Sequence, residues 1–330
     1  MFSGHGECIP LGKQGGFASP DGWMKSTERE TMEMEFERVY RFVKLLRVMF
    51  SCIGLCMITF GFGSSALAHN WQAKLWGKKP LGKAYVYKKG DGKRLHLYVL
   101  EPKKGSTKVK PAIIFFHGGG WVAGQAGQFN VQAHAAAEGG MVAIEVQYRL
   151  IRGTESPKVC VEDAKSAVRW VREHATELGV DPNRIVEAGG SAGGYLAAFA
   201  TMVPGWNDPH DDLSVSSKAD LLILYNPVID NSPSGYGYKR FAAEYKRYSP
   251  YFYVTPLTPP MLIMSGTNDK LIHEAVLKTF RDKLQEAGVP CDLILYPGAG
   301  HGFFNYPPHL KETTEAMLSF LQKHKYLNEP

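Results

Sequence analysis

RIVEAGGSAGGYLAAFA, residues 184–200, joins a short apolar strand to a helical pattern through a glycine-flanked serine. The pattern Gly-x-Ser-x-Gly at 189–193 is weak alone, since chance supplies it in roughly one chain of this size in every five to ten. Its place between a strand and a helix makes it specific, because such a turn strains the serine backbone and brings neighbouring chain so close that only glycine fits. The segment predicts a nucleophile, Ser191, at a helix N-terminus, where the dipole favours negative charge.

Short apolar runs alternate with helical patterns on both sides of this segment, which indicates a mostly parallel sheet covered on both faces. A helical pattern at 161–175, ended by Gly179, is typical of a crossover helix. The first two strands alternate apolar and polar residues and are joined at 90–92, which predicts an antiparallel edge. We expect an α/β fold of about eight strands, at 84–87, 95–99, 112–116, 142–144, 184–186, 221–224, 261–264 and 293–295.

One region breaks the alternation. Residues 227–260 are rich in Tyr, Pro, Gly and Ser, so we interpret them as an insertion that forms a wall or lid over a site. Its aromatic side chains either stack against a sugar or pack the insertion down, and the sequence does not separate these two roles.

A glycine loop, His117-Gly118-Gly119-Gly120-Trp121, follows the buried strand at 112–116. Its glycines leave backbone N–H groups free to face a substrate oxygen. The N–H groups of Gly119, Gly120 and Ala192 are therefore predicted to form an oxyanion hole. We expect His117 to hold the loop, and Trp121 and Tyr195 to bind substrate.

A nucleophilic serine needs a base, and the base needs an orienting carboxylate. Asp269 follows the strand at 261–264, and His301 follows the strand at 293–295. Both positions lie beyond carboxyl ends of parallel strands, at the edge where Ser191 is expected. We predict Asp269 as the acid and His301 as the base, although Asp269 could instead cap a helix that begins near Leu271, and Asp230 is a rival acid.

These residues resemble the esterase and lipase branch of the α/β hydrolases, that is, the hormone-sensitive-lipase-like group and its bacterial acetyl-esterase relatives. The resemblance implies the α/β-hydrolase fold, the triad Ser191, Asp269 and His301, and an oxyanion hole of Gly119, Gly120 and Ala192. The matching motifs are at 117–121, 148–150, 162–164, 181–185, 190–194 and 301–303.

Two departures from this group bear on the substrate. Gly190 stands where those members usually carry an acidic residue, and their helical N-terminal cap is missing, which leaves a reduced cap. Both departures resemble secreted carbohydrate acetyl esterases. The expected activity is hydrolysis of short-chain esters, acetyl esters above all, with carbohydrate as a candidate alcohol. The alternatives are a serine peptidase or amide hydrolase of the same fold and a non-catalytic ligand-binding protein.

The first 68 residues are predicted to be a leader, with the catalytic domain at 69–330. An apolar run at 48–63 follows Arg41, Lys44 and Arg47, and Ala66-Leu67-Ala68 is the small-x-small pattern of a signal-peptidase site. We therefore expect cleavage after Ala68 and a secreted or periplasmic protein. The alternative is a membrane anchor at 48–68.

Composition restricts the partners further. The net charge of +6 comes without a basic helix carrying interleaved aromatics, so no nucleic acid is expected, and the expected partner is a small-molecule or carbohydrate ester. The cysteines form no CxxC pair, so neither a metal nor another cofactor is expected. Cys160 and Cys291 follow the leader, and their pairing stays open.

Overall fold

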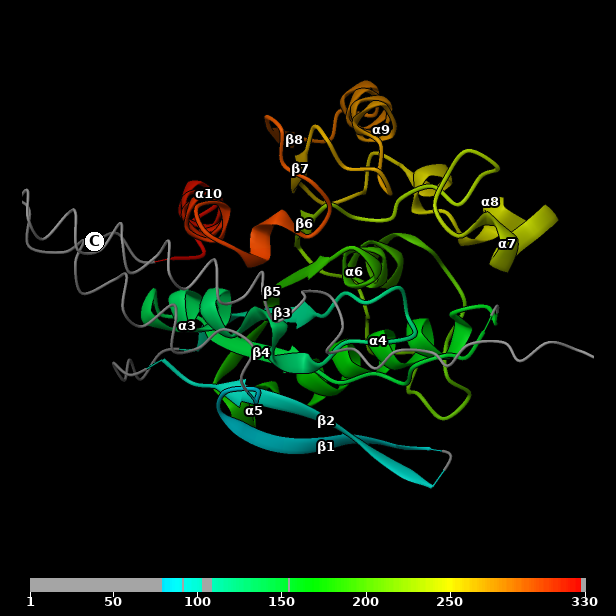
Figure 1. Ribbon diagram of the computed structural model, residues 1–330. Coiled ribbons are helices and arrows are strands. Elements are labelled where there is room, and N and C mark those ends of the chain that lie inside the picture. The colour runs from blue at the N-terminus through cyan, green and yellow to red at the C-terminus, as the bar shows by residue number, and fades with distance from the viewer. Residues whose placement is uncertain (1–78, 91, 103–108, 154, 328–330) are drawn as a thin grey trace, which may run out of the picture. The chain divides into compact units, whose positions relative to one another are not determined.

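The computed structural model describes residues 79–327 except 91, 103–108 and 154, so the predicted leader lies outside the described residues. Eight strands form one sheet in the order β1-β2-β4-β3-β5-β6-β7-β8 (Figure 1). Strands β1 and β2 are an antiparallel edge, and β4, β3 and β5 to β8 are parallel, which confirms the predicted mostly parallel sheet. The strands are β1 (Lys83–Gly90), β2 (Lys93–Leu100), β3 (Lys110–Phe116), β4 (Val142–Val146), β5 (Val180–Gly190), β6 (Leu221–Tyr225), β7 (Met261–Gly266) and β8 (Cys291–Tyr296).

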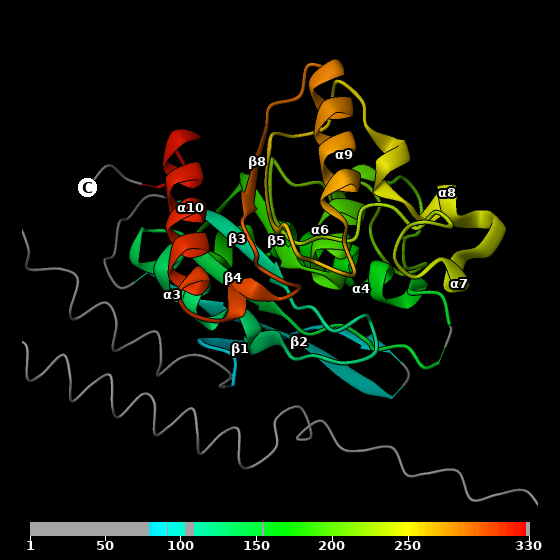
Figure 2. The same cartoon turned by 45° about the horizontal axis from the view of Figure 1, so that its top comes forward.

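Helices cover both faces of the sheet, as Figures 1 and 2 show. Side chains alternate along β3, so Ile114 and Phe116 belong to one apolar core while Ile113 and Phe115 belong to the other. The first core includes residues of α4 (Lys158–Glu173), α6 (Ala192–Met202) and α9 (Glu274–Glu286), and the second includes residues of α3 (Asn130–Glu138) and α10 (His309–Lys323). Continuous apolar runs in the parallel strands follow from this burial on both sides.

The prediction of one crossover helix at 161–175 was wrong about where that helix ends. Helix α4 ends at Glu173, and a separate short helix, α5 (Ala175–Leu178), follows. His174 lies between them and stacks on Trp170, with ring centroids 3.9 Å apart. Gly179, at φ 63°, ends α5 rather than α4. Helices often end at a residue in the left-handed conformation, which glycine adopts most readily.

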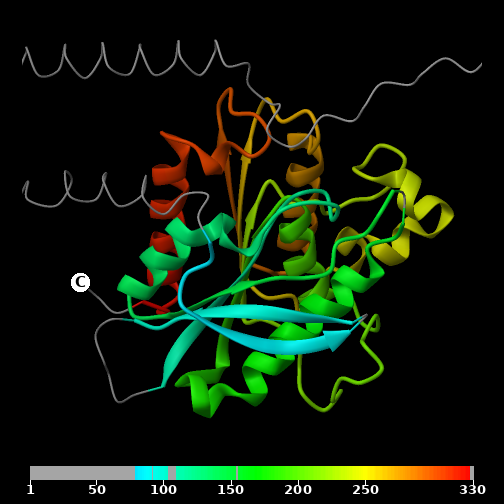
Figure 3. The ribbon, with the colours of Figure 1, turned by 60° about the horizontal axis from the view of Figure 1, so that its bottom comes forward.

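The predicted insertion lies between β6 and β7 and contains the short helices α7 (Tyr238–Phe241) and α8 (Tyr245–Tyr248). A 3-10 turn at Pro250–Tyr253 follows them and packs against α9, where Lys283 donates a hydrogen bond to the carbonyl of Tyr251 at 3.0 Å. Figure 3 shows the insertion in yellow beside α9. Phe241 and Tyr248 are buried, so part of its aromatic content packs the insertion onto the domain.

The described residues bear on three points of the sequence analysis, namely the cysteine pair, a membrane-spanning helix and a metal site. Cys160 and Cys291 are both free thiols, and burial raises the pKa of each to about 12. Within the residues that the structure describes, no helix is long and apolar enough to cross a membrane, and no group of three His, Cys, Asp or Glu side chains could hold a metal ion. The run at 48–68 lies outside those residues.

Candidate active site

The turn between β5 and α6 holds Ser191 in a strained conformation. Its φ of 54° and ψ of −116° lie outside the regions that a residue with a side chain prefers. The backbone is fixed from two sides, since the Ser191 N–H donates to the Tyr225 carbonyl at 2.8 Å and the Ser191 carbonyl accepts from Tyr195 at 3.0 Å. The neighbouring strand β6 and the first turn of α6 thus hold Ser191 in the strained conformation that the sequence predicted.

The glycines around Ser191 are required by close contacts. A Cβ on Gly193 would lie 2.0 Å from the carbonyl oxygen of Phe116, and a Cβ on Gly189 would lie 2.5 Å from the backbone of Gly193. The end of β3 and the start of α6 therefore approach more closely than any side chain permits. This contact brings the glycine loop, which follows β3, directly beside Ser191.

Three side chains from separate parts of the chain form one hydrogen-bonded row. His301 Nε2 lies 2.9 Å from Ser191 Oγ, and His301 Nδ1 lies 2.8 Å from Asp269 Oδ2. Since a carboxylate only accepts, Nδ1 donates to Asp269 and leaves Nε2 to accept the serine proton. The structure thus brings together Ser191, Asp269 and His301, the three residues that the sequence proposed as a triad.

Asp269 is fully buried in this row and keeps its charge. Burial acts to raise its pKa, but hydrogen bonds from His301 and from the backbone of Ile272 and Leu271 hold the pKa below its usual value. Helix α9 begins only at Glu274, so Asp269 caps the turn before the helix and does not cap the helix itself. Asp269 Oδ1 accepts from this turn, while Oδ2 accepts the hydrogen bond from His301.

The rival acid, Asp230, forms its hydrogen bonds within the insertion. Its two oxygens accept hydrogen bonds from the N–H and hydroxyl of Ser232, at 2.9 and 2.7 Å. Asp230 therefore stabilises a turn in the insertion.

The glycine loop presents free N–H groups beside Ser191. A Cβ on Gly118 would lie 3.5 Å from the Cβ of Ser191. Gly119 and Gly120 have positive φ angles of 119° and 62°, and among the described residues their N–H groups have no acceptor. This arrangement suits the oxyanion hole that the sequence predicts from Gly119, Gly120 and Ala192.

His117 braces the glycine loop from behind. Its Nδ1 donates to the Gly118 carbonyl at 2.8 Å, and its ring stacks on Tyr148 with centroids 4.2 Å apart. Burial lowers the pKa of His117 to about 4, so the ring is neutral near pH 7. These contacts fit the structural role expected for His117.

The two side chains predicted to bind substrate lie in the core. Trp121 and Tyr195 are both 0% exposed and meet edge to face, with ring centroids 5.1 Å apart. Trp121 Nε1 and the Tyr195 hydroxyl have no hydrogen-bond partner among the described residues. Trp121 also packs against Tyr236, with ring centroids 5.8 Å apart. The role of Trp121 and Tyr195 in substrate binding stays a prediction.

The sequence placed Tyr236 among the aromatic residues of the insertion without predicting its contact at the site, and it gave Phe304 no role there. Apart from Gly120 and its two chain neighbours, the Tyr236 hydroxyl is the one described atom within 4 Å of a Cβ placed on Gly120, at 3.1 Å, so the insertion reaches the glycine loop. Phe304 explains Gly190, because a Cβ on Gly190 would lie 2.4 Å from its ring. The aromatic ring fills the space that an acidic side chain would need. Neither contact has a signal in the sequence, since both join distant segments.

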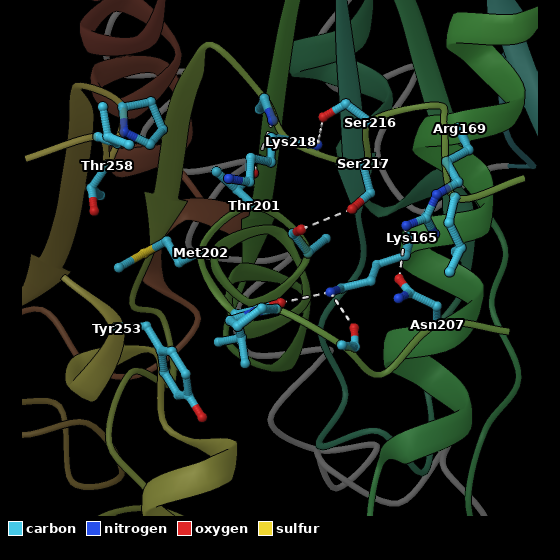
Figure 4. A pocket seen from close by; sticks show the side chains of 18 of the residues that line it. Lys165, Arg169, Thr201, Met202, Asn207, Ser216, Ser217, Lys218, Tyr253 and Thr258 are labelled. Carbon is cyan, nitrogen blue, oxygen red and sulfur yellow. Dashed lines mark hydrogen bonds between the residues drawn. The ribbon is translucent and has the colours of Figure 1, made fainter. Parts of the chain in front are cut away.

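A separate cavity of about 670 Å³ lies at the other end of α6 (Figure 4). It is lined by Thr201, Met202 and the loop that follows them, and it contains none of the three residues of the row. Beside it, Lys165 Nζ donates hydrogen bonds to the carbonyls of Val203 and Gly205, both at 2.6 Å. No buried polar side-chain atom in the described lining of this cavity lacks a partner.

The eight-stranded sheet, with a serine, a histidine and an aspartate joined at its carboxyl edge, defines an α/β hydrolase of the esterase and lipase type. The model of one family, BD-FAE, matches residues 96–284. Since this match covers more than half of the chain, the protein belongs to the BD-FAE family.

Several proteins similar to this chain are named as esterases. Carboxylesterase NlhH of Mycobacterium tuberculosis is 31% identical over 240 residues, which is 64% of this chain and 73% of NlhH. Esterase LipC of the same organism is 29% identical over 66% of this chain, and the match spans 60% of LipC. Among solved structures, esterase 2 of Thermogutta terrifontis is 40% identical with a TM-score of 0.72, covering 77% of this chain and 98% of that one. That esterase has been solved phosphoramylated by tabun and with propionate bound. The chain is thus similar to carboxylic ester hydrolases along most of its described length.

Proposed function

We propose that the protein hydrolyses short-chain carboxylic esters, acetyl esters above all, through an acyl-enzyme on Ser191. The observation that carries this proposal is the row Asp269–His301–Ser191, with hydrogen bonds of 2.8 and 2.9 Å, beside the free N–H groups of the glycine loop. Membership of the family and similarity to carboxylesterases support the reaction class.

In the first half-reaction, Ser191 Oγ attacks the ester carbonyl carbon while His301 Nε2 takes the hydroxyl proton. The carbonyl electron pair moves to oxygen, and the N–H groups of Gly119, Gly120 and Ala192 donate to this oxyanion. Each such donor contributes about 2.7 to 4 kcal/mol to transition-state stabilisation in other serine hydrolases. The carbon–oxygen bond to the alcohol then breaks, and His301 returns the proton to the leaving oxygen.

In the second half-reaction, water takes the place of the alcohol. His301 accepts a proton from water, whose oxygen attacks the acyl carbon, and Ser191 leaves with that proton as the acid is released. The Asp269 carboxylate stabilises the imidazolium in both halves, which requires that it stay ionised. Its lowered pKa meets this requirement.

Two observations support a short acyl group and a polar alcohol. Esterase 2 of Thermogutta terrifontis has been solved with propionate and with butyrate, which are short acids. The half-buried Tyr236 lies beside Gly120, so its hydroxyl can donate to an oxygen of the substrate. We propose a carbohydrate ester as the natural substrate, with the Tyr236 hydroxyl in contact with it. Tyr236→Phe should then lower kcat about tenfold, which is the scale of one hydrogen bond.

The test is a series of p-nitrophenyl esters from acetate to octanoate, run beside acetylated xylan and acetylated sugars. We expect the highest kcat/KM at acetate to butyrate and release of acetate from the sugars. Ser191→Ala should lose activity by about 10⁶-fold, the scale seen when such a nucleophile is removed. Undiminished turnover by Ser191→Ala would exclude the mechanism, and a maximum at octanoate would exclude the short-acyl preference.

We also propose that residues 48–68 direct export and are removed after Ala68. The uncharged run, the preceding basic residues and Ala66-Leu67-Ala68 support this. Mass spectrometry of the protein expressed with its full leader should find a mature N-terminus at His69. An intact leader in the membrane fraction would favour the anchor instead.

A further inference from the structure

Two side-chain amides connect the glycine loop to the histidine loop. Gln128 Oε1 accepts a hydrogen bond from the Gly118 N–H at 2.6 Å, and Gln128 Nε2 donates to Asn305 Oδ1 at 3.2 Å. Asn305 Nδ2 in turn donates to the Gly302 carbonyl at 2.9 Å. A continuous row of hydrogen bonds therefore runs from one loop to the other, between residues 177 positions apart in the chain.

Both ends of this row are next to groups of the proposed mechanism. Gly118 precedes the proposed oxyanion donors Gly119 and Gly120, and Gly302 follows the proposed base His301. The row does not reach Ser191, which is fixed separately through the Tyr225 carbonyl. It therefore joins the glycine loop to the histidine loop directly, in addition to the contacts that each loop makes with the nucleophile turn.

An apolar contact runs parallel to the amide row. Phe129 follows Gln128 and Phe304 precedes Asn305, and their rings stack with centroids 5.5 Å apart at an interplanar angle of 9°. Phe304 also occupies the space above Gly190. Gly302, whose carbonyl accepts from Asn305, also donates its N–H to Asn226 Oδ1 at 3.2 Å. The stack brings the two loops together, while the amide row sets their register.

We propose that Gln128 and Asn305 are positioning residues that fix the oxyanion donors relative to His301. Among the described residues neither amide is hydrogen bonded to Ser191, Asp269 or His301, so both act through Gly118 and Gly302. The inference rests on the proposed ester hydrolysis. In that reaction, Gln128 and Asn305 keep the oxyanion donors at a fixed distance from the base His301. A displacement of about 1 Å in such a site costs about 100-fold in rate, so a loss of this register lowers kcat more than it raises KM.

The experiment is a double-mutant cycle with Gln128→Met and Asn305→Leu, which keep side-chain bulk and remove the amides. We expect each variant to lower kcat for p-nitrophenyl acetate about 10- to 100-fold, with KM changed less than about threefold. The double variant should lose no more than the worse single variant, because either change already breaks the row. Asn207→Leu is the matched control: it removes a side-chain hydrogen bond to Arg169 at the far cavity, and kcat should stay within about twofold.

Gln128→Glu separates positioning from folding. A carboxylate still accepts from Gly118, so that N–H keeps its partner, but it cannot donate to Asn305. Its kcat should therefore fall as far as that of Asn305→Leu, which breaks the same bond. A second readout is the rate at which a fluorophosphonate labels Ser191, which needs no carboxylic ester and should fall in parallel with kcat. Equal melting temperatures with lowered kcat and labelling support the inference.

Two results would overturn it. One is a double variant whose loss is the product of the single losses, and the other is a kcat and labelling rate that match the Asn207→Leu control. Failure of the wild type to hydrolyse any ester, with labelling still slowed in the variants, would instead refute the proposed substrate class and leave the positioning role intact.

Discussion

The two ends of α6 differ in a way that locates the chemistry. At its N-terminus, Ser191 has a positive φ, glycines permit contacts that no side chain would, and the nearby glycine loop has free N–H groups. At its C-terminus, about 16 Å away for eleven residues of helix, lies the cavity of about 670 Å³, where Lys165 satisfies the carbonyls of Val203 and Gly205. Strain and free donors, rather than empty volume, mark the site.

The strongest test of this contrast removes the charge behind His301. Asp269→Asn should lower kcat by about 10⁴-fold with little change in melting temperature, because the amide stabilises the wrong tautomer of the imidazole. Steady-state kinetics on p-nitrophenyl acetate measure the loss. Asp230→Asn is the matched control, since Asp230 bonds Ser232, and its kcat should stay near wild type. A loss of equal size in both variants would contradict the assignment.

A smaller loss is expected when the close contact beside Ser191 is disturbed. A Cβ on Gly193 would lie 2.0 Å from a backbone oxygen, so Gly193→Ala must shift β3 or α6, and kcat/KM should fall about 100-fold or more. The comparison is Gly205→Ala at the other end of α6. Gly205 has φ 73°, and apart from its chain neighbours no described atom lies within 4 Å of a Cβ placed on it. The variant should therefore lose about 1 to 2 kcal/mol of stability and keep its activity. Equal activity of the two variants would remove the contrast.

The sequence predicted the sheet, its parallel order and the row of three residues because each depends on local signals. Apolar runs define strands, and the ends of parallel strands meet at one edge, so Asp269 and His301 could be placed beside Ser191. The break between α4 and α5 was missed, since the apolar periodicity continues across His174. The contacts of Phe304 with Gly190 and of Gln128 with Asn305 were also missed, because they join segments with no shared pattern.

At the C-terminal end, a substitution should change stability and leave catalysis intact. Lys165→Met removes two hydrogen bonds and leaves the buried Val203 carbonyl without its donor, which costs about 1 to 3 kcal/mol. Thermal melting should report this loss, while kcat on p-nitrophenyl acetate stays within about twofold. A large fall in kcat would show that the cavity communicates with the site.

The smallest expected effect is a pH dependence of stability from Glu187 on β5. Burial raises its pKa well above the ordinary value, although a hydrogen bond from Thr201 opposes the shift. A carboxyl with a raised folded-state pKa favours the folded state below its unfolded pKa of about 4.3 and loses this stability as pH rises toward the folded value.

Glu187→Gln should therefore gain on wild type as pH rises, by a few degrees in melting temperature, on a scale of about 2 to 4 °C per kcal/mol. Melting curves from pH 5 to pH 9 measure the difference between the two proteins. A difference that is flat across this range, or that reverses sign, would show that Glu187 is ionised in the folded protein. Activity at pH 7 should be the same in both.

The acyl group itself gives the most direct test of the nucleophile. Wild-type enzyme is mixed with p-nitrophenyl acetate, quenched in acid during turnover, digested and mapped by mass spectrometry. The account predicts one acetyl group, on the peptide that contains Ser191, and an initial release of nitrophenol equal to the enzyme concentration. An acetyl group on another residue, such as Lys165, with Ser191 unmodified would contradict it.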